Sequence, residues 1–161
     1  MSALLGLLDD PERARRWLAG LGVRDVERGW RDLRDLVHPD RPRASIGVLL
    51  SQLEQGLPSC PDPGMALTNL ERFLAAAPLP AATLGLLALD PRTFEVLLQL
   101  FSASQYLSDQ MIGEPELIHW LRAGAGRRDR DREIAPGDAF QPLTQSGKGD
   151  GQAVREHEDD G

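Results

Sequence analysis

Asp129 and Asp131 stand two residues apart, which is a spacing at which carboxylates can serve metal-dependent chemistry. On a strand, that spacing places both carboxylates on one face, where they can hold divalent ions against a triphosphate. Such a strand has to be buried between apolar neighbours. Here Arg128, Arg130 and Arg132 surround the pair and would neutralise it. We therefore interpret this segment as a solvated charge run rather than a metal site.

The other residues capable of catalysis are isolated from one another. Cys60 is the only cysteine, and no His or Asp lies immediately beside it to activate the thiol, so we interpret it as a small filler of a Pro-rich loop. The histidines His38, His119 and His157 are scattered along the chain. Phosphate-binding Gly-rich loops, dinucleotide fingerprints and nucleophile elbows do not occur. The sequence therefore predicts no catalytic, cofactor-binding or metal-ligating residue.

One tripeptide, His38-Pro39-Asp40, resembles the signature of J-domain cochaperones. In that family it lies between two antiparallel helices, beside a basic face that meets an acidic partner. Here Arg alternates with Asp along residues 31–35, which weakens such an attraction. We interpret the tripeptide as a helix stop and keep a cochaperone role as a distant third hypothesis.

Length and composition favour one helical domain. The chain has 161 residues, a formal charge of -7 and an aromatic content of 5%. Few aromatic and β-branched residues, together with the absence of hairpin turn signals, give strands little support. The negative charge argues against nucleic-acid binding through bulk charge. The resulting prediction is an all-α fold, an array of about eight short helices over residues 3–122.

Aspartate–proline pairs predict where several of these helices begin. Asp10, Asp62 and Asp90 can each cap free amides, and the proline that follows each of them fits the first helical position. Ser104 caps a further helix in the same way. The predicted segments are residues 11–20, 25–38, 46–56, 63–77, 80–89, 91–103, 105–113 and 115–121.

The charged face of the second predicted helix is expected to be solvated. Arg28 with Asp32, and Arg31 with Asp35, are spaced four apart, and each such pair contributes about 0.2–0.5 kcal/mol.

The stretch from Phe73 to Leu89 carries no charge and could be taken for a membrane span. It is shorter than the ~20 residues that a bilayer requires, and Pro78 and Pro80 interrupt it. We expect two buried helical segments joined by a turn, and no membrane association. The first ten residues contain no basic residue, and a single cysteine suits a reducing compartment, so we expect a cytoplasmic location.

The composition changes after Arg122. Residues 123–161 hold few large apolar side chains among Gly, Asp, Arg and Ser. Such a segment buries too little apolar surface to offset its conformational entropy, so we predict a disordered tail there.

Residues 69–74 read Asn-Leu-Glu-Arg-Phe-Leu, and residues 90–92, 97–109 and 114–117 follow in a matching order of helix starts and loops. This pattern resembles the amino-terminal helical region of the bifunctional glutamine synthetase adenylyltransferase/deadenylase family. The resemblance covers about residues 5–122. It implies that Asn69, Glu71, Arg72 and Asp109 match the family's pattern, and we expect them to form interhelix hydrogen bonds and ion pairs.

The resemblance also implies an activity. In that family one domain transfers AMP from ATP, with Mg²⁺, to a tyrosine of glutamine synthetase, and a related domain removes it by phosphorolysis. Glutamine synthetase and a small nitrogen-signalling regulatory protein are the implied partners. The family's Ser-Asp-x-Asp catalytic signature is absent from this sequence. We therefore expect a chain truncated before the catalytic core, binding no cofactor and inactive alone; the alternative is a non-catalytic helical interaction module.

Overall fold

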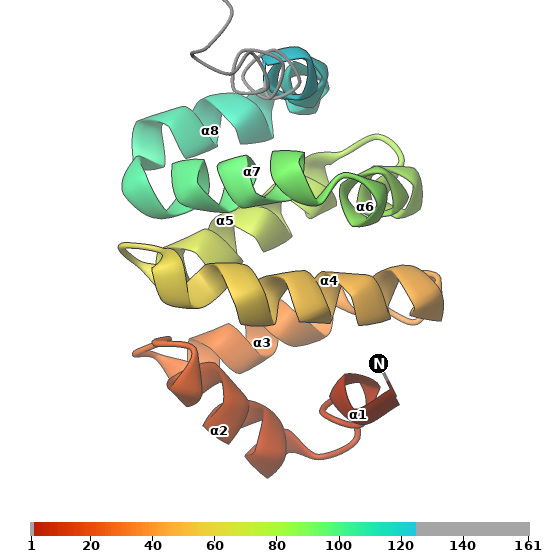
Figure 1. Cartoon of the computed structure of the whole chain (residues 1–161), viewed down its shortest axis with the longest axis vertical. Helices are drawn as coiled ribbons and strands as arrows, with labels where there is room; N and C mark the ends of the chain where they lie inside the picture. Colours follow the sequence, from red (N-terminus) through yellow and green to blue (C-terminus); the bar gives the residue numbers. More distant parts are fainter. Residues whose placement is uncertain (1, 125–161) are drawn as a thin grey trace, which may run out of the picture.

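A computed structural model describes residues 2–124, and within them every regular element is helical (Figure 1). The predicted all-α class is confirmed for this part of the chain. The elements are α1 (Ser2–Leu5), α2 (Pro11–Gly20), α3 (Val26–Leu36), α4 (Arg43–Gly56), α5 (Pro63–Ala76), α6 (Pro80–Leu89), α7 (Pro91–Ala103) and α8 (Gln105–Gly113), with 3₁₀ turns at η1 (Leu57–Ser59) and η2 (Pro115–Leu117). Residues 118–124 are helical as well.

Local capping explains where α2, α3, α5, α7 and α8 begin, whereas α4 and α6 begin without a side-chain cap. The side chains of Asp10, Asp25, Asp62 and Asp90 each accept a hydrogen bond from the backbone amide three residues further on, at 2.9–3.1 Å. Ser104 does the same at the start of α8. Each cap satisfies an amide that has no partner inside the helix, which stabilises the first turn. These starts agree with those that the sequence predicts.

The helices stack along the long axis of the molecule, from α1 and α2 at one end to α8 near the other (Figure 1). α5 is the central element, because it packs against α3, α6, α7 and α8. Its fully buried Phe73 meets Phe101 of α7 with ring centroids 5.7 Å apart in a tilted arrangement. Tilted aromatic pairs of this kind contribute beyond their buried area. The core is therefore continuous from α2 to α8.

Several boundaries differ from the sequence-based expectation. α1 was not predicted, and the Pro-rich connection after Gly56 contains the 3₁₀ turn η1. The last predicted segment begins as the 3₁₀ turn η2 and becomes α-helical only from residue 118. Of the predicted disordered segment 123–161, Ala123 and Gly124 continue this helix. Residues 125–161 lie outside the described part of the chain.

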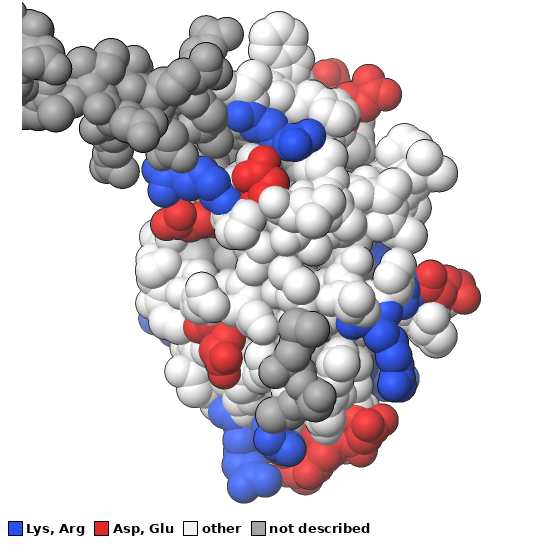
Figure 2. Space-filling view, turned by 45° about the vertical axis from the view of Figure 1, so that its right-hand side comes forward, with Lys and Arg blue, Asp and Glu red and all other residues white. Residues whose placement is uncertain are grey.

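The expectation of two buried segments within Phe73–Leu89 is only partly correct. The turn between α5 and α6 is present, but the buried residues of α6 are Leu84 and Leu87, and Leu79 and Leu89 are 70% and 87% exposed. Figure 2, which looks onto this side, shows uncharged surface across its middle. None of the described helices combines the length and the apolar character needed to cross a membrane.

Candidate functional site

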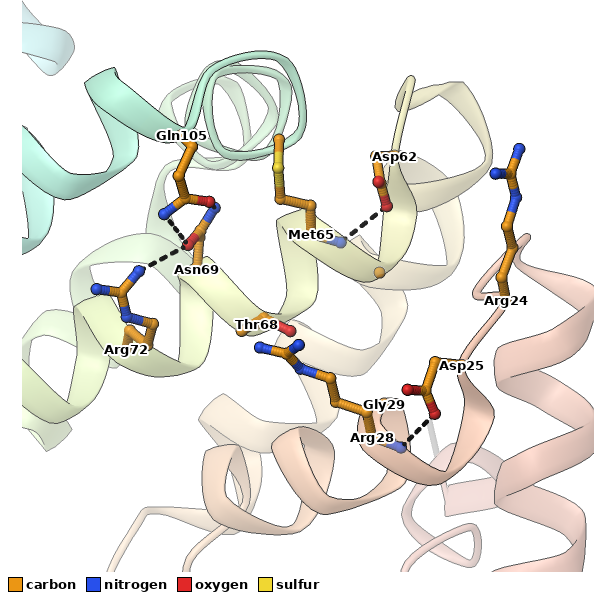
Figure 3. A pocket seen from close by; sticks show the side chains of 11 residues that line it. Arg24, Asp25, Arg28, Gly29, Asp62, Met65, Thr68, Asn69, Arg72 and Gln105 are labelled. Atoms are coloured by element: carbon orange, nitrogen blue, oxygen red, sulfur yellow. Dashed lines mark hydrogen bonds between the residues drawn. The ribbon is translucent and has the colours of Figure 1, made fainter.

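A cleft of about 520 Å³ lies between the N-terminal halves of α3 and α5, beside the start of α8 (Figure 3). Its walls are partly polar and partly apolar and carry three arginines. The residues that line it are Arg24, Asp25, Arg28, Gly29, Asp62, Gly64, Met65, Thr68, Asn69, Arg72 and Gln105. Clefts of this size accommodate ligands larger than a single inorganic ion.

Two capped helix starts form the edge of this cleft. Asp25 accepts a hydrogen bond from the Arg28 amide at 3.0 Å, and Asp62 accepts one from the Met65 amide at 2.9 Å. Both carboxylates are therefore engaged by the N-terminal amides of α3 and α5. The helix starts themselves carry partial positive charge, which offsets part of the negative charge of these two aspartates.

A close approach of α3 to the preceding loop brings its first turn to the cleft. A Cβ on Gly29 would lie 2.9 Å from Cγ1 of Val23, so a larger residue at this position would force the loop away. Gly22 turns the chain between α2 and α3 with a φ of 89°, a backbone conformation that glycine adopts readily. These two glycines determine where Arg24 and Arg28 stand relative to α5.

The guanidinium groups of Arg24 and Arg28 are available to a ligand. Both side chains are exposed, and in the described part of the chain neither forms an ion pair with a carboxylate. Figure 3 shows Arg28 extending from α3 toward Thr68 of α5. The Thr68 hydroxyl of α5 donates a hydrogen bond to Oδ2 of Asp32 at 2.6 Å. The Asp32 carboxylate is therefore bound to α5. The predicted pairing of Arg28 with Asp32 is absent.

A polar network closes the α8 end of the cleft. Asn69, which is 1% exposed, donates from Nδ2 to the carbonyl of Phe101 at 3.0 Å and to Oε1 of Gln105 at 3.2 Å. Gln105 donates in return to Oδ1 of Asn69 at 3.3 Å and to Asp109 at 2.9 Å. Arg72 pairs with Asp109 at 3.0 Å and donates to Oδ1 of Asn69 at 3.3 Å. The expected interhelix bonding of Asn69, Arg72 and Asp109 is confirmed.

Glu71, the fourth residue of the expected set, is not part of this network. Burial raises the pKa of its carboxyl, and the nearby charges of Asp32 and Asp35 raise it further, against the opposing effect of Arg41 and Arg72. Its ionised carboxylate is therefore unfavourable in the folded state. Glu71 does not line the cleft.

The cleft contains hydrogen-bond donors and cations but no nucleophile with a base beside it. In residues 2–124 no group of three His, Cys, Asp or Glu side chains is placed to hold a metal ion. The guanidiniums of Arg24 and Arg28, which have no ion pair in the described part of the chain, favour binding of a negatively charged group at this open cleft. The arrangement is thus suited to recognition, and the described residues assemble no catalytic constellation in it.

Cys60, His38 and His119 lie away from the cleft. Cys60 is buried, donates weakly to the carbonyl of Gly56 at 3.5 Å, and has a pKa raised by burial, which agrees with its interpretation as a filler. His38 lies in an exposed turn after α3, with Nδ1 3.1 Å from Asp40, and α3 and α4 pack mainly on different helices. His119 is exposed. Asp129, Asp131 and His157 fall outside the described residues.

Arg24, Arg28, Thr68 and Gln105 are the cleft residues that sequence reasoning missed. Their positions in the sequence do not distinguish them from other surface residues, because each lies in a segment whose residue pattern is typical of exposure to solvent. Among the cleft residues, the sequence pointed only to Asn69 and Arg72. They were found, together with Glu71, because residues 69–74 resemble the family pattern described above.

Comparison with known proteins gives one partial likeness. The bifunctional glutamine synthetase adenylyltransferase/adenylyl-removing enzyme of Pseudomonas aeruginosa is 31% identical in an alignment of 119 residues that covers 70% of this chain and 12% of that protein. The chain thus spans about an eighth of the length of this relative. No protein-family model matches the chain. No solved structure matches it.

Proposed function

We propose that this chain is the N-terminal helical part of a glutamine synthetase adenylyltransferase/adenylyl-removing nucleotidyltransferase. The observation that carries the proposal is the 31% identity over 119 residues. It gains support from Asn69, Arg72 and Asp109, which match the family's pattern and join α5 to α8. Residues that hold two helices in register are the kind that a shared fold requires.

The proposed role of this chain is to provide a helical scaffold. Transfer of an adenylyl group requires carboxylates on a rigid support, to hold Mg²⁺ against the triphosphate of ATP. The sequence has no Ser-Asp-x-Asp segment, and the arginine-lined cleft contains no free pair of carboxylates. We therefore place the catalytic segment outside this chain, in a cytoplasmic system whose partners are glutamine synthetase and a nitrogen-signalling protein.

An incorporation assay tests this proposal. The purified chain is incubated with labelled ATP, Mg²⁺ and glutamine synthetase, and the full-length Pseudomonas enzyme serves as the active control. We expect label on glutamine synthetase from the control only. Label transferred by this chain above background would show that the catalytic groups are inside it. Translation of the downstream DNA in all frames provides a second check, because the proposal expects a Ser-Asp-x-Asp segment there.

A non-catalytic interaction module is the second candidate, and the arginine-lined cleft favours it. Titration calorimetry of the chain with glutamine synthetase measures this directly. Arg28→Gln should weaken binding if the cleft is the contact, whereas Arg34→Gln, an exposed arginine of α3 outside the cleft, should not. Equal affinities for both variants would place any contact elsewhere.

A further inference from the structure

An exposed apolar face lies where α6 meets η2 and the helix of residues 118–124, at the end of the stack opposite α1 (Figure 1). Leu79, at the start of α6, is 70% exposed, and Trp120 is 77% exposed. The neighbouring Leu117 and Leu121 pack against the hydrophobic core, whereas Trp120 is not part of it. Tryptophan is usually well buried in folded proteins, and exposed apolar surface next to a hollow marks a protein contact.

Two adjoining hollows shape this face. The first, here called the α6 hollow, has a volume of about 290 Å³, and its apolar lining includes Leu79, Leu86 and Ile118. An apolar cavity of about 150 Å³ already accepts a benzene molecule, so the α6 hollow has room for an indole ring. The second hollow extends along residues 113–120 to Trp120. The lining residues that the two hollows share are Pro78, Pro115, Glu116 and His119.

The two sides of this face are held together within the fold. Nε of Arg122 donates to Oδ2 of Asp90 at 3.1 Å, which joins the helix of residues 118–124 to the end of α6. Ile118, at the base of the α6 hollow, is 4% exposed and belongs to the core. A surface that is already ordered loses little conformational entropy when it binds a partner.

The charges on this face favour a second copy of the chain as the occupant. Glu116 and His119 are the only ionisable residues among the described residues that line the α6 hollow, and both are exposed. In a two-fold pair, His119 of one copy can face Glu116 of the other, so a single patch supplies both members. A chain with a formal charge of -7 repels its own copies over most of its surface, but an apolar face with few charges allows them to meet.

We propose that this face is a self-association surface, on which Trp120 of each copy enters the α6 hollow of the other. An indole and a hollow on the same patch are self-complementary, because a two-fold axis between them brings each one opposite the other. Tryptophan side chains that fill apolar pockets often dominate the binding free energy of an interface. The inference does not depend on the adenylyltransferase relationship, and its failure would leave that relationship unaffected.

Sedimentation analysis of the full chain, from micromolar to submillimolar concentration, tests the proposal. We expect the average mass to rise toward twice that of the chain. Trp120→Ser and Leu79→Glu should each weaken the association at least about tenfold, since each removes both contacts of the pair. Tyr106→Ser is the matched control, because Tyr106 is 72% exposed on α8 and lines neither hollow. A chain that stays monomeric, or a dimer that Trp120→Ser leaves unchanged, would overturn the proposal.

A mixture of the two variants tests the contact itself. The Trp120→Ser chain keeps an intact α6 hollow, and the Leu79→Glu chain keeps the indole. A mixed pair therefore contains one complete contact, whereas either variant paired with itself contains none. We expect mixed dimers to form more tightly than dimers of either variant, and no gain on mixing would overturn the proposal. Both substituted side chains are exposed, so circular dichroism should show that each variant keeps the helix content of the unaltered chain.

Discussion

Arg72 of α5 and Asp109 of α8 form an ion pair with a distance of 3.0 Å between Nη1 and Oδ1, across 37 residues of sequence. The same Nη1 also donates to the buried Asn69. Through this bond to Asn69, the ion pair contacts the buried core on one side, and both of its side chains remain about half exposed to solvent. It joins the central helix to the far end of the stack.

A double-mutant cycle should measure a small but real coupling in this pair. Both side chains are about half exposed, and such pairs contribute about 0.2–1 kcal/mol to the free energy of unfolding. Urea denaturation of Arg72→Gln, Asp109→Asn and the double variant gives the coupling energy. We expect it to shrink in high salt, because exposed charges are screened. The control is Arg92 with Glu95, a pair within α7 that cannot couple two helices.

Replacing Asn69 should cost more than breaking the ion pair. Asn69→Ala removes the donor to the Phe101 carbonyl and both bonds to Gln105 in a buried position, so we expect a loss of about 1–3 kcal/mol in the free energy of unfolding. Gln99→Ala is the matched control, since its amide bonds to Ser59 at the exposed surface. A loss from Asn69→Ala no greater than that from Gln99→Ala would show that the network is not structural.

Substitution by alanine should have opposite effects on stability at Gly20 and Gly22. Gly22 has a φ of 89°, and a Cβ there would also lie 3.3 Å from Cγ of Pro63, so Gly22→Ala should destabilise the fold by about 1–2 kcal/mol. Gly20, at the end of α2, has nothing within 4 Å of an added Cβ. Gly20→Ala should therefore be neutral or stabilising. Thermal melting of both variants checks this, and destabilisation by Gly20→Ala alone would contradict the turn assignment.

Glu71 should make stability depend on pH. Burial, followed by repulsion from Asp32 and Asp35, raises the pKa of Glu71 in the folded state, so the folded chain binds a proton there more readily than the unfolded chain. The ionised carboxylate therefore destabilises the fold above its folded pKa, and this penalty disappears as the pH falls below the ordinary glutamate value. Glu71→Gln should raise the melting temperature at neutral pH and lose that advantage in acid.

Glu116→Gln serves as the control for that experiment, because Glu116 is exposed in the 3₁₀ turn η2, away from α5. Its effect should stay within about 0.5 kcal/mol at both pH values. A gain from Glu71→Gln that persists unchanged at low pH would mean that packing, and not the charge, is responsible.

Helix starts were predictable because capping is a local interaction. Asp10, Asp62 and Asp90 each bond an amide three residues away, so residue type and spacing suffice to place the first turn. The 3₁₀ turn η2 shows the limit of this reasoning, since Glu114 and Pro115 begin a helix there without a side-chain cap.

Side-chain partners on the helix faces were less predictable. Spacing alone suggested that Arg28 pairs with Asp32 within its helix, but Asp32 accepts from Thr68 instead. Glu27 of α3 binds Arg15 of the neighbouring α2, with 2.7 Å between Arg15 Nε and Glu27 Oε1. Local pairs of exposed charges contribute so little that spacing alone does not decide which partner a side chain takes once a neighbouring helix offers another.

The order of residues alone specified a helical chain and the starts of most helices. The resemblance to a known family added Asn69, Glu71, Arg72 and Asp109 as bridging residues, and all of these except Glu71 form interhelix bonds. Assembly of the helices decided which arginines share a cleft, because Arg24 and Arg28 meet Arg72 only when α3 packs on α5. It also left one side of the uncharged α6 exposed. Hydrogen bonds within one helical turn depend on neighbouring residues, whereas a cleft depends on segments some 40 residues apart, whose proximity is decided by burial of the whole core.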